Sequence, residues 1–430
     1  MRSQSLSFGA FAILLLASFL ALWLLPNWNR NIPAFLAIYF FAFTAYLAAA
    51  YFALRGSWDH IPRLSFYIFL FAVAFRLIIF WTPEYLSGDI YRYLWDGRVQ
   101  AAGFGPYDYP PEAKEVASLR DENFHHLTYK WLRTNYPPAA ETIFHLLART
   151  RSFSLFKLGI LCFDFLLIEI LRRLLAQENL PPAFLLIYAW HPLPVIEFAG
   201  SAHMDVIGIT LFLTSYFLVS KSWSAAGGCT LALAILTKYI PVFSLPWLMR
   251  KTGWKFVAFL LVTMAAVTLP YYTSDLRMLD GLIYYYRKWR FNDSLFGALY
   301  LWLGGAEPAR RAGLAAVLVS TAFCWIARYS FYRSMLIIFG AIILFSPVVH
   351  PWYVCWLIPF LVFHRNRAWQ FFTGWIALAY LIIHFYPAGV WKHLLWLKLV
   401  IYVPLFLGLL LDWLISRVGA KHLRWLRFAR

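Results

Sequence analysis

Long apolar runs separated by short polar segments dominate the chain from end to end. A helix needs about 20 mostly apolar residues to cross a bilayer, and about twelve windows of the sequence come close to that length. The predicted spans are 7–25, 33–54, 63–82, 154–173, 181–196, 205–220, 253–272, 309–328, 334–350, 352–364, 369–386 and 394–416. The pattern therefore predicts an all-α polytopic membrane protein.

One further apolar stretch, residues 223–249, is interrupted by Lys238 and by two prolines. Basic residues flank it on both sides, with Lys221 before it and a cluster at 250–255 after it. Basic flanks are typical of the cytoplasmic side of a membrane. We therefore expect this stretch to form a re-entrant pair of short helices.

The composition supports a membrane protein, because 62% of the 430 residues are hydrophobic and 20% are aromatic. A soluble domain of this length could not bury so much apolar surface in one core. The four cysteines lie inside apolar spans without metal-ligand spacing, so we expect neither a metal site nor a disulfide. No glycine-rich phosphate loop or dinucleotide pattern is present, so we expect no cofactor.

The net charge of +18 comes mostly from basic residues in short loops and in the C-terminal tail 417–430. If these residues mark the cytoplasmic side, both termini lie inside and the segments 83–153 and 273–305 lie outside. We therefore predict a multi-pass protein of the inner (plasma) membrane. The basic tail would also attract anionic membrane lipids, so no nucleic-acid partner is needed to explain the charge.

Polar side chains gather in three short stretches that are predicted to lie at the external side. The first reads SGDIYRYLWDGR at 87–98, the second HPLPVIEFAGSAHMD at 191–205 and the third VVHPWYVCW at 348–356. Polar groups at membrane depth cost several kcal/mol unless they are paired or functional. We therefore expect the three clusters to form the walls of one site.

The first cluster is predicted to be an amphipathic external helix from Asp89 to Ala102. On a helix, residues three and four apart share a face, which would align Asp89, Arg92, Tyr93 and Asp96. The sequence GFGPYDYPP follows, and its glycines and prolines are expected to end the helix.

At these residues the chain resembles a known family. The segment DxYRYxWDGRxQAxGxxPY, a later YPP element, an ExxGxxHxD stretch and a late HPWY are similar to motifs of the C-type (GT-C) glycosyltransferases that use polyprenyl-phosphate sugars. The chain resembles most the bacterial mannosyltransferases that extend phosphatidylinositol mannosides and lipoglycans. It departs from the family pattern in two ways, with two extra spans before the first motif and HMD where an HND-like triplet is common.

The resemblance implies a division of the chain and a reaction. We expect two extra N-terminal spans (1–62), a GT-C-like catalytic core (63–273), variable C-terminal spans (274–416) with an external segment at 273–308, and the basic cytoplasmic tail. The enzyme would move a hexose, mannose in the family, from a polyprenyl-phosphate donor to a glycolipid or glycan acceptor at the extracytoplasmic face. It would invert the anomeric carbon, and a lipid monophosphate leaving group does not obviously require a metal.

Asp89 matches the catalytic aspartate of the family, which implies a general base that takes the proton of the acceptor hydroxyl. Asp96 is the alternative base. A purely structural alternative for Asp89 is that its side chain caps the helix.

The donor phosphate needs cationic or hydrogen-bonding groups. Arg92 and Arg98 are candidates, although they could also pair with nearby aspartates or lipid headgroups. Lys238, beside Tyr239 in the broken stretch, is a stronger candidate because a lysine is costly inside an apolar segment. Its structural alternative is an ion pair with a carboxylate such as Asp164 or Glu169.

The remaining candidates are substrate-binding residues. His203 and Asp205 would orient sugar or acceptor hydroxyls, with helix capping as the alternative for Asp205, and Glu197 is similar. His350 and Tyr353 would contact phosphate or sugar, with anchoring at the membrane interface as the alternative. Tyr93 completes the set through its place on the predicted face of the first cluster.

Two other classes of protein share some of these features. A transporter or lipid flippase would also be apolar, with broken helices and a buried lysine, but the spans show no half-to-half symmetry. A sugar polymerase or O-antigen ligase-like enzyme would use a lipid diphosphate and should rely more heavily on arginine.

Overall fold

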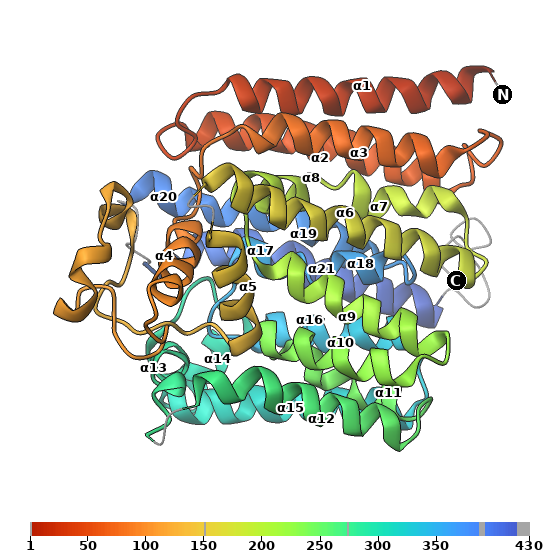
Figure 1. Ribbon diagram of the computed structural model, residues 1–430. Helices are drawn as coiled ribbons and strands as arrows, with labels where there is room; N and C mark the ends of the chain where they lie inside the picture. Colours follow the sequence, from red (N-terminus) through yellow and green to blue (C-terminus); the bar gives the residue numbers. More distant parts are fainter. Residues whose placement is uncertain (1, 150–151, 273–274, 387–391, 419–430) are drawn as a thin grey trace. The chain divides into compact units, whose positions relative to one another are not determined.

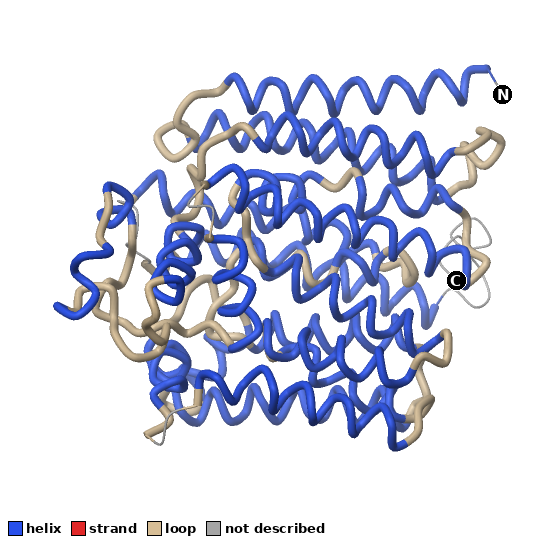
Figure 2. The backbone as a smooth tube through the Cα atoms, in the orientation of Figure 1, coloured by secondary structure: helices blue, strands red, loops and turns tan. Residues whose placement is uncertain are grey.

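The computed structural model describes residues 2–149, 152–272, 275–386 and 392–418, and within them the chain is helical apart from loops and one isolated β-bridge (Figures 1 and 2). This confirms the all-α class. Most of the predicted C-terminal tail lies outside the described residues.

Six helices among the described residues are long and apolar enough to cross a membrane, or seven if one bent pair counts as a span. The predicted count of about twelve spans is therefore not confirmed. Several predicted spans form shorter helices, such as α3 (Leu64–Phe80) and α16 (Phe331–Phe345). The long helix α6 (Phe153–Gln177) carries Lys157, Asp164 and Glu169 within its apolar run, which lowers its hydropathy.

The chain divides into two compact units that interleave along the sequence. The first comprises 1–79, 175–195 and 290–430, and the second comprises 80–174 and 196–289. The domains predicted from the sequence follow the chain in order, whereas each unit is assembled from separated segments. The helices of the first unit are α1 (Arg2–Leu24), α2 (Ile32–Leu54), α3, α7 (Leu186–Ala189), α8 (Pro192–Pro194), α14 (Leu295–Trp302), α15 (Ala306–Ile326), α16, α17 (Pro351–Val354), α18 (Ile358–Leu361), α19 (Arg367–Trp375), α20 (Leu381–Phe385) and α21 (Leu395–Val418).

The second unit holds most of α6 and two groups of helices. Around the predicted external segment lie α4 (Asp89–Ala101), the 3₁₀ turns Lys114–Leu119 and Glu122–His126, and α5 (Pro138–Ala148). The rest of the unit is formed by α9 (Asp205–Ser220), α10 (Ser224–Thr237), the 3₁₀ turn Ile240–Ser244, α11 (Leu245–Met249), α12 (Trp254–Thr268) and α13 (Asp280–Lys288).

Helices α9, α10 and α12 pack side by side because small residues let their backbones approach closely (Figure 1). A Cβ atom on Gly228 of α10 would lie 2.3 Å from the carbonyl oxygen of Phe256 in α12. On the other side of α10, the Ser215 hydroxyl of α9 donates to the Gly227 carbonyl at 2.7 Å. Larger residues at either glycine would force the helices apart.

The broken stretch turns back on itself. Helix α10 ends at Thr237, and the next residue, Lys238, reaches the first residue of α9, Asp205. After α11 the Lys251 ammonium lies 5.5 Å from the ring centroid of Tyr216, which is in the C-terminal part of α9. The segment 240–249 therefore returns toward the end at which α10 begins, which is the geometry expected of a re-entrant pair.

The predicted span 181–196 is broken in the first unit, and neighbouring side chains satisfy the freed carbonyl groups. The Tyr46 hydroxyl donates to the Ile187 carbonyl at 2.8 Å, and Arg76 Nη1 donates to the Ala189 carbonyl at 2.8 Å. Backbone groups that lose their helical partners in an apolar environment need such substitutes. The break is therefore a stable feature of the fold.

The orientation predicted from the basic loops is tested by cysteine labelling in a background in which Cys162, Cys229, Cys324 and Cys355 are replaced by alanine. Ser118 and Lys251 are both exposed residues of the second unit. We expect Ser118→Cys to react with an impermeant maleimide in intact cells and Lys251→Cys to react only after permeabilisation. The opposite pattern would show that the predicted orientation is inverted.

Candidate active site

Helix α4 places Asp89 as its first residue, directly after Gly88. No side chain caps this helix, so the capping role considered for Asp89 is wrong. The same holds for Asp205, because α9 begins there after Met204 without a side-chain cap. Both carboxylates are therefore available for interactions other than helix capping.

His203 lies between two carboxylates. Its Nδ1 atom is 3.6 Å from Asp89 Oδ2, and its Nε2 atom is 3.5 Å from Glu197 Oε2. The backbone holds this arrangement, because the His203 N–H donates to the Glu197 carbonyl at 2.9 Å. His203 and Glu197 are fully buried, whereas one third of the Asp89 side chain is exposed. The carboxylate that solvent or a substrate can reach is Asp89.

A second charged pair joins Asp205 to Lys238, whose ammonium donates to Asp205 Oδ1. Asp205 is buried, and 23% of the Lys238 side chain is exposed. Burial raises the pKa of Asp89 to about 6, helped by the negative charge of Asp205 and opposed by Lys238 and by a hydrogen bond from Ser87. Asp89 is therefore ionised at neutral pH but remains a useful proton acceptor.

Two tyrosines complete the surroundings of Asp89. Tyr93 is buried and stacks on Phe144, with ring centroids 4.5 Å apart. Its hydroxyl accepts hydrogen bonds from the Tyr136 hydroxyl and from the backbone N–H of Met204. Burial, followed by the charge of Asp89, raises the pKa of both phenols well above the usual value, so both remain protonated. Tyr136 belongs to the YPP element but was not a predicted site residue.

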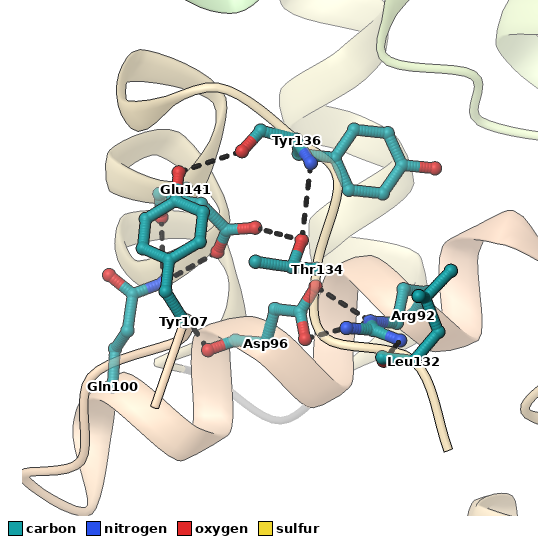
Figure 3. Close-up of polar contacts among 8 residues, drawn as sticks. All are labelled: Arg92, Asp96, Gln100, Tyr107, Leu132, Thr134, Tyr136 and Glu141. Atoms are coloured by element: carbon teal, nitrogen blue, oxygen red, sulfur yellow. Dashed lines mark hydrogen bonds and ion pairs between the residues drawn. The ribbon is translucent and has the colours of Figure 1, made fainter. Parts of the chain in front are cut away.

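Arg92 and Asp96 bind each other further along α4 (Figure 3). The Nε atom of Arg92 donates to both Asp96 oxygens at 2.9 Å, and its Nη1 atom donates to the Leu132 carbonyl at 2.9 Å. Asp96 is buried, so this pair ties α4 to the loop before α5. The structure thus gives Asp96 a structural partner, and a substrate would have to share Arg92 with it.

The same network contains a second buried carboxyl group, Glu141 of α5, which the sequence analysis missed (Figure 3). It accepts hydrogen bonds from the Thr134 hydroxyl at 2.6 Å and from the Gln100 amide at 3.0 Å. Burial and the neighbouring Asp96 carboxylate raise its pKa well above the usual value. These surroundings favour the neutral form of Glu141, whereas Asp96 has the Arg92 guanidinium as its partner.

The other predicted residues of the second unit make different contacts. Arg98 forms an ion pair with Asp121 near the surface, with its guanidinium 5.6 Å from the Trp95 ring centroid. Glu169, considered as a partner for Lys238, pairs instead with two arginines that follow it in α6. Tyr239 is 38% exposed beside Lys238.

His350 and Tyr353 belong to the first unit. The His350 ring stacks on Trp352 with centroids 4.3 Å apart and on Phe291 at 4.9 Å, and Tyr353 meets it edge-on. Residues of the first and second predicted clusters thus come together within the second unit, and the third cluster belongs to the first unit. Its role in binding substrate stays a prediction.

No group of three or more histidine, cysteine, aspartate or glutamate side chains is arranged to hold a metal ion in the part of the chain that the structure describes. Several helices are long and apolar enough to span a bilayer, and a proton-accepting carboxylate lies among histidine, lysine and tyrosine side chains. Together these features define a helical membrane protein with a site suited to acid–base chemistry.

Comparison with known protein families identifies the class further. Residues 5–252, more than half of the chain, match the family described as alpha-(1->6)-mannopyranosyltransferase, N-terminal domain. The chain belongs to this family of mannosyltransferases, which confirms the resemblance found in the motifs. The match begins within α1, so it includes nearly all of the two N-terminal helices α1 and α2 that the sequence analysis took as additions to the family. No curated protein matches the chain.

The buried network of α4 predicts a difference between two charge removals on the same helix. Asp96→Asn leaves the Arg92 guanidinium without its buried partner, which typically costs about 3–5 kcal/mol. Arg98→Gln breaks a pair near the surface and should cost less than about 1 kcal/mol. We expect a clearly lower thermal midpoint for the purified Asp96→Asn protein and an almost unchanged one for Arg98→Gln. Equal midpoints would contradict a structural role for the Arg92–Asp96 pair.

Proposed function

We propose that this mannosyltransferase takes mannose from a polyprenyl-phosphate donor and transfers it to a glycolipid or glycan acceptor with inversion, using Asp89 as the general base. The observation that carries the proposal is the Asp89 carboxylate, which is one third exposed, has a pKa of about 6 and lies 3.6 Å from the buried His203 ring. The family match supports the transfer of mannose and favours an enzyme over the transporter considered above.

The base step follows from the position of Asp89. As the acceptor oxygen attacks the anomeric carbon, the bond from that carbon to the phosphate oxygen breaks and the hydroxyl proton moves to Asp89. A carboxylate with a pKa near the working pH accepts this proton better than an ordinary aspartate would. Protonation converts Asp89 to the neutral carboxylic acid, which its buried surroundings favour.

The residues around Asp89 suggest separate tasks. His203, fixed by Glu197, would orient the Asp89 carboxylate as a histidine between two acids can. Both phenols remain neutral, so they add no charge to the site. The Tyr93 hydroxyl would donate a hydrogen bond to a sugar oxygen, whereas the Tyr136 hydroxyl, which already donates to Tyr93, would accept one from a sugar hydroxyl.

Lys238 would bind the donor phosphate while still paired with Asp205, because an ammonium group has three hydrogen-bond donors. Arg92 would contribute its Nη2 atom, which is buried and has no hydrogen-bond partner among the described residues. Asp96, Arg98 and Tyr239, together with His350 and Tyr353, remain proposed substrate contacts of lower priority.

The proposed site faces the extracytoplasmic side of a multi-pass inner membrane protein, with α4 and α5 outside the bilayer as amphipathic helices. The short helices α3, α9, α16 and the broken segment 182–200 would cross the membrane with the six long helices. A site on that face is consistent with lipid-linked substrates of the cell envelope.

Asp89→Asn tests the base assignment, because it removes the proton acceptor while keeping the size of the side chain. General-base catalysis contributes about 10²- to 10⁴-fold, so we expect transfer of mannose from polyprenyl-phosphate mannose to fall by roughly that factor. Donor binding should persist because other groups hold the phosphate. An Asp121→Asn variant, altered near the surface, serves as the control and should keep its activity.

The same substitution should not lower stability. The pKa of Asp89 is higher in the folded protein than in the unfolded chain, so keeping it ionised above about pH 6 costs folding free energy. Asparagine removes that cost, and we expect an unchanged or higher thermal midpoint at pH 7.5. Retention of most activity by Asp89→Asn would exclude it as the base.

Lys238→Ala tests the phosphate assignment. A charge-assisted hydrogen bond contributes about 1.5–3 kcal/mol, so the KM for the donor should rise roughly 10- to 150-fold while the KM for the acceptor changes little. Lys251→Ala, in the same turned-back stretch but at the other end of it, is the matched control. An unchanged donor KM, or equal losses in stability and activity, would show that Lys238 serves only to neutralise Asp205.

A further inference from the structure

The first unit holds a charged cluster around Asp293 that has no part in the proposed reaction. The Asp293 side chain is fully buried. Arg290 donates to its Oδ2 atom through Nη2 at 2.6 Å and through Nε at 3.2 Å, and the Lys398 ammonium of α21 donates to its Oδ1 atom. His393 Nδ1 lies 3.8 Å from the same Oδ1. Three basic side chains from two distant parts of the chain thus meet one carboxylate.

Backbone contacts hold this cluster in place. The Phe291 N–H donates to the Pro347 carbonyl at 2.9 Å, and the Val349 N–H donates to the Phe291 carbonyl at 2.9 Å. From α21, one turn beyond Lys398, the Tyr402 hydroxyl donates to the Asn292 carbonyl at 2.7 Å. The segment carrying Arg290 and Asp293 is therefore fixed before any ligand arrives.

The cluster carries more positive than negative charge. Arg290 and Lys398 bring two full charges, and Asp293 balances one of them. Both cations are largely covered, with 22% and 16% of their side chains exposed. An excess charge at a partly buried position is costly unless an anion approaches it. Next to Asp293, the Ser294 hydroxyl is buried and has no hydrogen-bond partner among the described residues, so a further donor is present.

The apolar side chains around the cluster are suited to contact with the acyl chains of a lipid. Lys398 lies one turn inside the candidate span Leu395–Ile415, of which only 17% is buried. Large apolar side chains stand exposed beside it on α21, with Leu395 at 71% and Leu399 at 52%. Acyl chains could cover these leucines while the headgroup of the same lipid reaches the cations. A free anion would leave the leucines exposed.

We propose that Arg290, Lys398 and Ser294 bind the negatively charged phosphate-ester headgroup of a membrane lipid. A guanidinium group has five N–H donors, of which Arg290 gives two to Asp293, so the others can donate to a phosphate, and an ammonium and a hydroxyl add further donors. Asp293 holds the two cations side by side and leaves one positive charge for the lipid. The proposal does not rest on the transfer reaction, and its test reads binding rather than turnover.

The test uses the full-length protein purified in a neutral detergent, with dioleoyl phosphatidic acid, dioleoyl phosphatidylcholine or inorganic phosphate added. Thermal midpoints report stabilisation by a ligand that binds the folded state, and native mass spectrometry counts the bound lipids. We expect phosphatidic acid to bind and to raise the midpoint, and we expect phosphatidylcholine and inorganic phosphate at equal concentration to do neither.

Single substitutions then separate binding from structure. Lys398→Met and Arg290→Gln each leave one cation for Asp293, so the midpoint without lipid should stay nearly unchanged while the affinity for phosphatidic acid falls roughly tenfold or more. Ser294→Ala keeps every charge and should weaken the lipid without changing the midpoint. Arg311→Gln, which removes an exposed cation from α15, is the control and should bind like the wild type.

Three results would overturn the proposal. Equal affinity for phosphatidic acid in the variants and in the Arg311→Gln control would remove the cluster as the site. An equal effect of inorganic phosphate would show a site for free anions rather than for lipid. A collapse of the lipid-free midpoint in both Lys398→Met and Arg290→Gln would show that both cations are needed to bury Asp293.

Discussion

The second unit packs five carboxyl groups around α4 and the start of α9, and among the described residues only two strong cations pair with them. This shortage of positive charge organises the site. The acids are Asp89, Asp96, Glu141, Glu197 and Asp205, and the cations are Arg92 and Lys238. A buried carboxylate is stable only if it is paired, hydrogen-bonded or protonated. The protonation state of each acid therefore depends on which partner it has.

Two acids obtain the cations. Asp96 pairs with Arg92 and Asp205 pairs with Lys238, while burial and the nearby Asp96 raise the pKa of Glu141 and favour its neutral form. Asp89 receives no cation of its own. Its pKa rises because burial and Asp205 disfavour its charge, and the result is a carboxylate suited to accept a proton. The basicity of Asp89 is thus a consequence of how its neighbours are neutralised.

The paired acids also fix the position of Asp89. Close packing at Gly97, where a Cβ would lie 2.4 Å from the Phe144 carbonyl oxygen, presses α4 against α5. The Arg92–Asp96 pair and the bond from Gln100 to Glu141 hold the register of the two helices. Because these contacts come from the same short helix as Asp89, they set the place and direction of its carboxylate. Helix α4 therefore carries both the Asp89 carboxylate and the contacts that hold it in place.

Sequence reasoning found the parts of the site that lie on one element and missed those that need long-range contacts. The spacing of Asp89 and Asp96 predicted a helix with both residues on one face, and the structure has a helix there, α4. The spacing could not show that the Asp89 side chain would be partly exposed and the Asp96 side chain buried. Pairing of Lys238 with Asp205 depends on the register of α10 against α9, which no local pattern encodes.

The same limit applies outside the site. The cluster at Asp293 needs Lys398, which lies 105 residues further along the chain, so its local sequence gave no signal. The predicted count of about twelve spans is not confirmed, because hydropathy registers apolar length but not helix breaks. The predicted span 352–364 illustrates this, since it forms the two short helices α17 and α18.

The most direct test of this account is the pH dependence of kcat/KM for mannose transfer, compared between the wild type and Asp205→Asn. In the wild type the rate should fall as the pH drops through about 6, because Asp89 takes up a proton there. Removing the negative charge of Asp205 should lower the pKa of Asp89 and move this acid limb to lower pH. An acid limb at the same pH in both proteins would show that the titrating group is not Asp89.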